Sequence, residues 1–132
     1  MSPVKDVTYV SDCSLVVEDD FSVRETLGMV LEAYHHEPLL VRDGEDALKK
    51  LGVSWPDVML LDLSLPGMSG EEVYAKIQSE FGKVPPTVIL SAVHEGADRA
   101  RFMPGTWFLA KPYTIEQLAD ILFEASSSRG AA

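Results

Sequence analysis

The sequence lacks the features that would place it outside a cell or in a membrane. It has one cysteine, Cys13, among 132 residues, so no internal disulfide can form, and a single thiol fits a reducing compartment. No apolar run approaches the roughly 20 residues that a membrane-spanning helix needs. The N-terminus, "MSPVKDVTYVSDCS", also lacks the charged and then apolar layout of a signal peptide. These absences favour a cytoplasmic protein with no membrane partner.

Basic residues are scarce as well. The chain has 11 Lys and Arg against 21 Asp and Glu, a formal net charge of −10. A domain that binds nucleic acid needs a basic surface for the phosphates, so we expect no nucleic-acid partner. With 46% hydrophobic and 24% charged residues, the composition is that of a soluble globule, and the length suits one domain.

Short apolar runs alternate with helical patterns along the chain. The apolar runs predict five strands, at 14–19, 38–42, 57–62, 87–92 and 106–110. Apolar residues at helical spacing predict helices at 21–36, 43–52, 69–82 and 114–127. Between residues 94 and 105 we expect a fourth helix that is short or irregular, because Pro104 and Gly105 interrupt it.

Helix starts and buried faces are also predicted. Two capping boxes, each a hydroxyl residue with Glu or Gln three positions later, are Ser69 with Glu72 and Thr114 with Gln117. The side chains expected to face inward are Val23, Leu27, Val30, Leu31 and Tyr34 in the first helix, and Ile115, Leu118 and Leu122 in the last. The pair His35–His36 is expected at a helix end, where cationic side chains are favourable, and not at a metal.

This alternation predicts a parallel sheet with helices on both faces. Nearly continuous apolar strands fit such a buried sheet. Right-handed crossovers then bring the carboxyl ends of all strands to one edge, where ligands bind in α/β folds. We expect one α/β domain over residues 14–126, an N-terminal extension over 1–13 and a disordered tail over 127–132.

Reactive side chains follow four of the five predicted strands. Glu18 and Asp19 end the first, Asp62 the third, Ser91 lies near the end of the fourth, and Lys111 follows the fifth. Two carboxylates ~5 Å apart repel by roughly 3 kcal/mol at an effective dielectric near 20, which a divalent cation such as Mg²⁺ would offset. With Glu18 and Asp19 holding the metal, Asp62 is suited to attack phosphorus as a nucleophile. Lys111 and the metal would neutralise the phosphoryl oxygens, and Ser91 could hydrogen-bond the attached group.

A family resemblance rests on four motifs. "LVVEDD", "LLDLSLPGMSG", "VILSA" and "FLAKPY" together resemble the receiver domain of bacterial two-component response regulators, from about Ser14 to Ala125. The resemblance implies a flavodoxin-like, doubly wound five-stranded parallel sheet of order 2-1-3-4-5. It also implies a phosphoacceptor signalling module, of a stand-alone single-domain type, that catalyses at most its own phosphotransfer and dephosphorylation.

The resemblance assigns roles to the acidic residues. Asp62 matches the aspartate that accepts a phosphoryl group from a sensor histidine kinase or a histidine phosphotransfer protein. Glu18 and Asp19 match the acidic pair that holds Mg²⁺, together with Asp62 and the backbone carbonyl of Ser64.

Further roles follow on the fourth and fifth strands. Lys111 matches the lysine that pairs with the phosphoryl group, and a cis peptide bond is implied between Lys111 and Pro112. Ser91 and Phe108 match the two positions that switch conformation on phosphorylation. A downstream protein target is implied without being identified, and a phosphorylation-dependent dimer is compatible with the pattern.

Two alternatives remain open from the residues. A small phosphatase of the haloacid-dehalogenase type also uses a strand-end aspartate, but it normally has a second aspartate where this chain has Ser64. A pseudo-receiver would keep the fold as a scaffold without phosphorylation, which the intact set of Asp62, Lys111 and the acidic pair argues against. A Rossmann-type cofactor site is disfavoured because no G-x-G-x-x-G follows the first strand.

Overall fold

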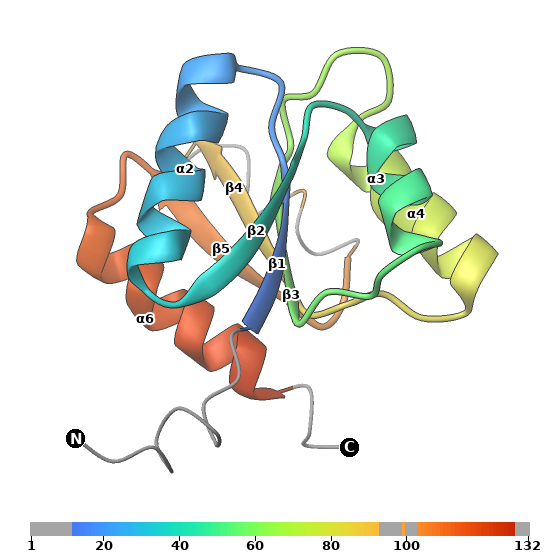
Figure 1. The fold of residues 1–132 in the computed structure, drawn as a ribbon. Helices are drawn as coiled ribbons and strands as arrows, with labels where there is room; N and C mark the ends of the chain where they lie inside the picture. Colours follow the sequence, from blue (N-terminus) through green and yellow to red (C-terminus); the bar gives the residue numbers. More distant parts are fainter. Residues whose placement is uncertain (1–11, 93–98, 100–102, 129–132) are drawn as a thin grey trace, which may run out of the picture.

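A computed structural model describes residues 12–92, 99 and 103–128. Within these ranges one parallel sheet has the order β2-β1-β3-β4-β5, which confirms the predicted topology. The strands are β1 (Asp12–Val17), β2 (His36–Val41), β3 (Val58–Asp62), β4 (Thr87–Ala92) and β5 (Thr106–Lys111). The described helices are α2 (Phe21–Ala33), α3 (Gly44–Leu51), α4 (Gly70–Phe81) and α6 (Ile115–Ser127). Helices α2 and α6 cover one face of the sheet and α3 and α4 the other, as in flavodoxin-like folds (Figure 1).

The two faces of the sheet are both buried. Successive side chains of a strand point to opposite faces. Val16 and Leu60 therefore belong to the apolar cluster under α2 and α6, while Leu15 and Met59 belong to the cluster under α3 and α4. This double burial explains why the strands are apolar without alternation, and why a carboxylate at the end of β3 is exceptional.

The helices begin at side chains that cap their first turn. The two predicted capping boxes are both formed, with reciprocal hydrogen bonds between Ser69 and Glu72 and between Thr114 and Gln117. Asp20 is the N-cap of α2 and accepts a hydrogen bond of 3.0 Å from the Val23 amide. Helices α2, α3 and α6 each begin soon after the preceding strand ends, so these loops at the carboxyl edge are short.

The prediction for the histidine pair is confirmed for His35, whose amide donates to the Glu32 carbonyl at the end of α2, and was wrong for His36. Helix α2 ends at Ala33, His35 has a positive φ of 68°, and His36 opens β2. His36 is buried, and its Nδ1 lies 2.5 Å from Ser14 Oγ on the adjacent strand β1. This cross-strand hydrogen bond gives the imidazole a buried polar partner, which local helical periodicity does not reveal.

Three predicted inward positions are exposed instead. Val23, Tyr34 and Ile115 expose 37%, 44% and 54% of their surface. Each lies at a helix terminus, and the sheet and the neighbouring helices cover only the middle turns, where Leu27 and Leu118 are buried. Helical periodicity identifies which face of a helix points inward. How many turns of that face are buried depends on the packing of the sheet and the neighbouring helices.

Some predicted boundaries shift. Strand β1 begins at Asp12, inside the predicted N-terminal extension, and α6 continues through Ser127, the first residue of the predicted tail. The expected short fourth helix, at 94–105, falls largely outside the described residues. Among the described helices, none combines the length and apolar character needed to cross a bilayer.

Candidate functional site

The carboxyl edge of the sheet brings the predicted acidic residues together. Glu18 follows β1, and its backbone amide still donates to the Val41 carbonyl of β2 at 3.0 Å. Asp62 is the last residue of β3. One carboxylate oxygen from each of Glu18, Asp19 and Asp62 lies within 4.8 Å of the others. The three carboxylates thus form one cluster from two neighbouring strands.

Asp62 is a buried carboxylate held by donors. It is only 3% exposed. Its Oδ1 accepts from the Ser64 amide at 2.7 Å, and its Oδ2 accepts from Lys111 Nζ at 3.0 Å. Burial by itself would raise the pKa of Asp62, but hydrogen bonds with Glu18, the Ser64 amide and Lys111 lower it below its ordinary value. Asp62 is therefore ionised at neutral pH, as a nucleophile must be.

The surroundings of Glu18 shift its pKa in the direction opposite to that of Asp62. Burial, and then its hydrogen bond to Asp62, raises the pKa of Glu18 to about 7. Its Oε2 accepts from the Asp20 amide at 3.1 Å, whereas its buried Oε1 has no hydrogen-bond partner in the described part of the chain. A buried carboxylate oxygen without a donor is unusual, and a cation would satisfy it. The donor set of three carboxylates is also the hard oxygen chemistry that Mg²⁺ prefers, so the residues fit this metal.

Ser91 and Lys111 complete the edge. Ser91 lies in β4 next to Leu90, which pairs with Asp62 in register. Its Oγ is buried and lacks a hydrogen-bond partner among the residues described. Lys111 ends β5, and its peptide bond to Pro112 is cis, as the resemblance implied. A hydroxyl donor and an ammonium thus come from the two strands beyond β3.

The remaining predicted residues lie close to this site. Ser64 contributes its amide to Asp62, and its expected role as a carbonyl ligand of the metal stays a prediction. Phe108 is partly buried and packs against a small cluster of Leu63, Ile89 and Met103. Because Leu63 directly follows Asp62, the aromatic ring is linked to the acidic residue by continuous packing.

Two residues that support the site were missed by sequence reasoning. Arg24 of α2 donates from Nη1 to the carbonyls of Glu18 and Asp19, at 2.8 and 3.2 Å, and so fixes the acidic loop. Tyr113 has a raised pKa because of burial, and then because of the charges of Glu18 and Asp62. An arginine on a helix belongs to no sequence motif that would mark it as a ligand of this loop. Only its closeness in sequence to Glu18 and Asp19 could have suggested that Arg24 binds their carbonyls.

Comparison with known proteins decides the family. A profile of the response regulator receiver domain matches residues 14–123. The chain belongs to the response regulator receiver domain family. It is therefore related to phosphoacceptor signalling modules.

Relatives of this receiver domain include longer regulators. It is 35% identical over 107 residues to the phosphate regulon transcriptional regulatory protein PhoB of Escherichia coli, covering 79% of this chain and 47% of PhoB. It is 34% identical to the positive alginate biosynthesis regulatory protein of Pseudomonas aeruginosa, covering 85% of this chain and 46% of that protein. The chain thus spans about half the length of the curated relatives it matches.

Solved receiver structures share the fold of this domain. The chemotaxis protein CheY4 of Vibrio cholerae has a TM-score of 0.79 and 25% identity, covering 88% of this chain and 99% of CheY4. The receiver domain of the sensor histidine kinase PA1611 from Pseudomonas aeruginosa has a TM-score of 0.78 and 26% identity, covering 90% of this chain and all of that one. The latter structure has a magnesium ion coordinated in its active site cleft.

Proposed function

We propose that Asp62 accepts a phosphoryl group from a phosphohistidine of a sensor histidine kinase or a histidine phosphotransfer protein. The observation that carries this proposal is the pairing of an ionised, buried Asp62 with Lys111 on one side and a Glu18 oxygen without a donor on the other. Glu18, Asp19 and Asp62, with the Ser64 carbonyl, would hold Mg²⁺, and the bound ion would neutralise charge on the phosphoryl oxygens.

The reaction proposed at Asp62 is a phosphoryl transfer between partners. A carboxylate oxygen forms a bond to phosphorus, the bond from phosphorus to the donor's imidazole nitrogen breaks, and the nitrogen keeps the electron pair. Lys111 stabilises the negative charge that shifts onto the phosphoryl oxygens. The Ser91 hydroxyl, which has no acceptor among the described residues, donates to the phosphoryl group once it is attached.

The structure offers a surface where the phosphodonor could dock. An apolar groove of about 330 Å³ lies between α2 and the start of α6, with Val23, Leu27, Tyr113 and Ile115 among its lining residues. Burial, and then the charges of Glu18 and Asp62, raise the pKa of the lining residue Tyr113, so the groove lies near the acidic site. We assign this groove to the protein that presents the phosphohistidine. The downstream target, the cytoplasmic location and a phosphorylation-dependent dimer stay predictions.

Intact mass spectrometry tests the proposal directly. The protein is incubated with Mg²⁺ and acetyl phosphate, with Asp62→Asn as the matched variant because it keeps the side-chain shape. We expect the parent to gain one phosphoryl group, and we expect EDTA or Asp62→Asn to prevent the gain. Equal gain in Asp62→Asn would show that another residue is the acceptor. Steady turnover of p-nitrophenyl phosphate would instead favour the phosphatase alternative, and uptake from neither acetyl phosphate nor a panel of phosphorylated donors would favour a scaffold.

A further inference from the structure

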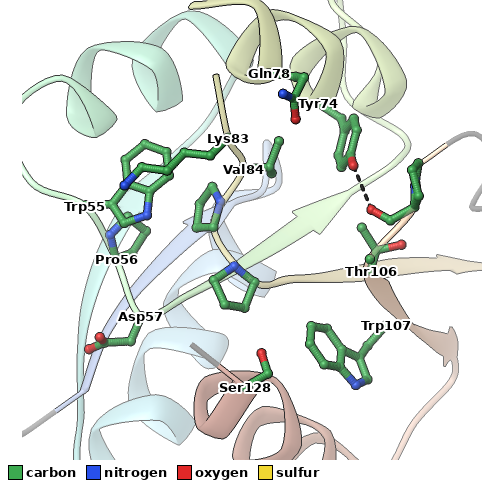
Figure 2. A pocket seen from close by; sticks show the side chains of 14 residues that line it. Trp55, Pro56, Asp57, Tyr74, Gln78, Lys83, Val84, Thr106, Trp107 and Ser128 are labelled. Carbon is green, nitrogen blue, oxygen red and sulfur yellow. Dashed lines mark hydrogen bonds between the residues drawn. The ribbon is translucent and has the colours of Figure 1, made fainter. Parts of the chain in front are cut away.

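A cavity of about 790 Å³ lies at the amino-terminal edge of the sheet, opposite the edge that carries Asp62. Its aromatic walls are the rings of Trp55, Tyr74 and Trp107, as Figure 2 shows. Lys83 lines it together with the carboxyl ends of α4 and α6, each equivalent to roughly −0.5 elementary charge, so these charges cancel. The Asp57 carboxylate accepts from the Cys13 amide at 2.7 Å and points away from the cavity (Figure 2). The described walls therefore select no ligand by charge, unlike the acidic edge, where Arg24 lies.

Arg24 of α2 contacts the backbone of both loop residues that are proposed to hold the metal. Its Nη1 donates to the Glu18 carbonyl at 2.8 Å and to the Asp19 carbonyl at 3.2 Å. Its guanidinium carbon also lies 5.6 Å from the centre of the Phe21 ring, one turn earlier in the same helix. The guanidinium is thus held by two carbonyls and an aromatic ring, and it fixes the direction of two consecutive peptide groups.

The position of the Asp19 carboxylate depends on this backbone contact. Asp19 is exposed, and its side chain accepts no hydrogen bond from the residues that the structure describes. One of its oxygens nevertheless lies within 4.8 Å of an oxygen of Glu18 and of Asp62, a separation at which ionised carboxylates repel each other. A carboxylate without a donor is placed only by its own backbone, and Arg24 holds that backbone.

The charge of Arg24 and its contacts have opposite effects on metal binding. A positive charge near a cation site repels the cation, so charge alone would make the loss of Arg24 strengthen Mg²⁺ binding. A contact that orients metal ligands acts in the other direction, and its loss typically weakens binding by about 10–100-fold. The sign of the change in affinity therefore distinguishes the two effects.

We propose that Arg24 is a positioning residue for the Mg²⁺ site. By binding the two carbonyls, it holds the loop in the conformation that brings the carboxylates of Glu18 and Asp19 to Asp62. The loop then needs no rearrangement on binding Mg²⁺, which increases the affinity. This inference rests on the proposed function for the identity of the ion, but it concerns metal affinity and not the acceptance of a phosphoryl group.

Isothermal titration calorimetry of the full chain with Mg²⁺ tests this role. Arg24→Met keeps an aliphatic side chain but loses the charge and the donors, and we expect its dissociation constant to be about tenfold higher than that of the parent. Arg24→Lys, whose ammonium can still donate to a carbonyl, should have an intermediate value. An affinity of Arg24→Met equal to or higher than that of the parent would overturn the proposal. If circular dichroism shows that Arg24→Met is unfolded, parent-like affinity in Arg24→Lys would overturn it instead.

A control variant and a rate measurement separate positioning from net charge and from catalysis. Lys76→Met removes a positive charge from the exposed side of α4 and should not change the Mg²⁺ affinity, and an equal weakening there would overturn the specific role of Arg24. At saturating Mg²⁺, phosphorylation of Arg24→Met by acetyl phosphate should return to the parent rate, because a positioning residue affects metal binding and not the transfer. A rate that stays low would place Arg24 in the transfer step, against the proposal.

The same titrations distinguish a failure of this inference from a failure of the proposed function. Absence of Mg²⁺ binding by the parent would contradict the proposed metal site itself. Equal Mg²⁺ affinities of the parent and Arg24→Met would contradict only the role of Arg24.

Discussion

Lys111 Nζ lies 3.0 Å from Asp62 Oδ2, although 49 positions separate them and β4 lies between their strands in the sheet. The two partners differ in environment, because the Lys111 side chain is 39% exposed and that of Asp62 only 4%. Water screens the exposed partner, so this ion pair contributes little to stability. Its importance is that a partly exposed ammonium group lies beside an ionised carboxylate.

Lys111→Met should separate metal binding from phosphoryl transfer. The pKa of Asp62 should rise, because a hydrogen bond and a positive charge no longer lower it. Phosphorylation by acetyl phosphate should slow by a factor on the order of 10², the usual cost of losing one charge-stabilising donor. Intact mass against time measures the rate of phosphorylation, and isothermal titration calorimetry with Mg²⁺ measures the affinity for the metal. Lys76→Met, on the exposed side of α4, is the control, and an equal loss there would refute a specific role for Lys111.

The raised pKa of Glu18 predicts that the stability of the metal-free protein depends on pH. Its pKa in the folded chain is about 7, above the ordinary 4.5, so the folded state holds this proton more tightly than the unfolded chain does. Its contribution to stability is therefore complete below about pH 4.5 and is lost as the pH rises to about 7. Glutamine at this position cannot ionise. The free energy of unfolding of Glu18→Gln, relative to that of the parent, should therefore increase by about 1–3 kcal/mol when the pH is raised from about 5 to about 8.

Urea unfolding of the parent and of Glu18→Gln, in EDTA at about pH 5 and about pH 8, measures this difference in the free energy of unfolding. The same variant should lose Mg²⁺ affinity, because an amide replaces the anionic oxygen that lacks a donor. Gain of stability together with loss of metal binding would identify a residue kept for function. Parallel pH profiles for parent and variant would contradict the assignment of the raised pKa to Glu18.

Ser91→Ala should leave the unphosphorylated protein at least as stable as the parent. The Ser91 Oγ is buried without a partner within the described ranges, and such a group costs about 1–3 kcal/mol. In the phosphorylated protein the same change removes a proposed donor to the phosphoryl group. We therefore expect phosphorylation to change the NMR chemical shifts of Phe108 less in Ser91→Ala than in the parent. A clear loss of stability before phosphorylation would mean that the hydroxyl has a partner in the folded chain.

Gly70→Ala should disturb the acceptor site through packing. A Cβ at Gly70 would collide with Leu63 Cδ2 and lie 3.1 Å from Leu63 Cα, directly after Asp62. Overpacking of this kind costs about 1–3 kcal/mol, and moving Leu63 should also weaken Mg²⁺ binding. Gly52→Ala is the matched control, because Gly52 has right-handed backbone angles and its nearest neighbour would be at 3.5 Å. Thermal unfolding should show a loss for Gly70→Ala alone, and similar melting temperatures would refute the steric argument.

The sequence predicted the strands more accurately than it predicted the buried residues of the helices. Apolar runs ending in Asp62 and Lys111 located the strands, because burial on both faces leaves a continuous signal in the sequence, whereas the strand order followed only from the family resemblance. His36 was misplaced because its partner, Ser14, lies on another strand. Tyr34 and Ile115 were assigned inward because helical spacing does not reveal where covering by the sheet ends.

The sequence by itself determined the fold class, the family resemblance and the identity of the clustered acidic residues, because these depend on local patterns and on the chirality of strand crossovers. Only the tertiary structure decided how the two central carboxylates differ. Burial raises the pKa of Glu18, while donors from Ser64 and Lys111 help to lower that of Asp62. The cavity at the opposite edge is likewise a tertiary feature, because its aromatic rings and helix ends come from segments that meet only when the sheet has formed.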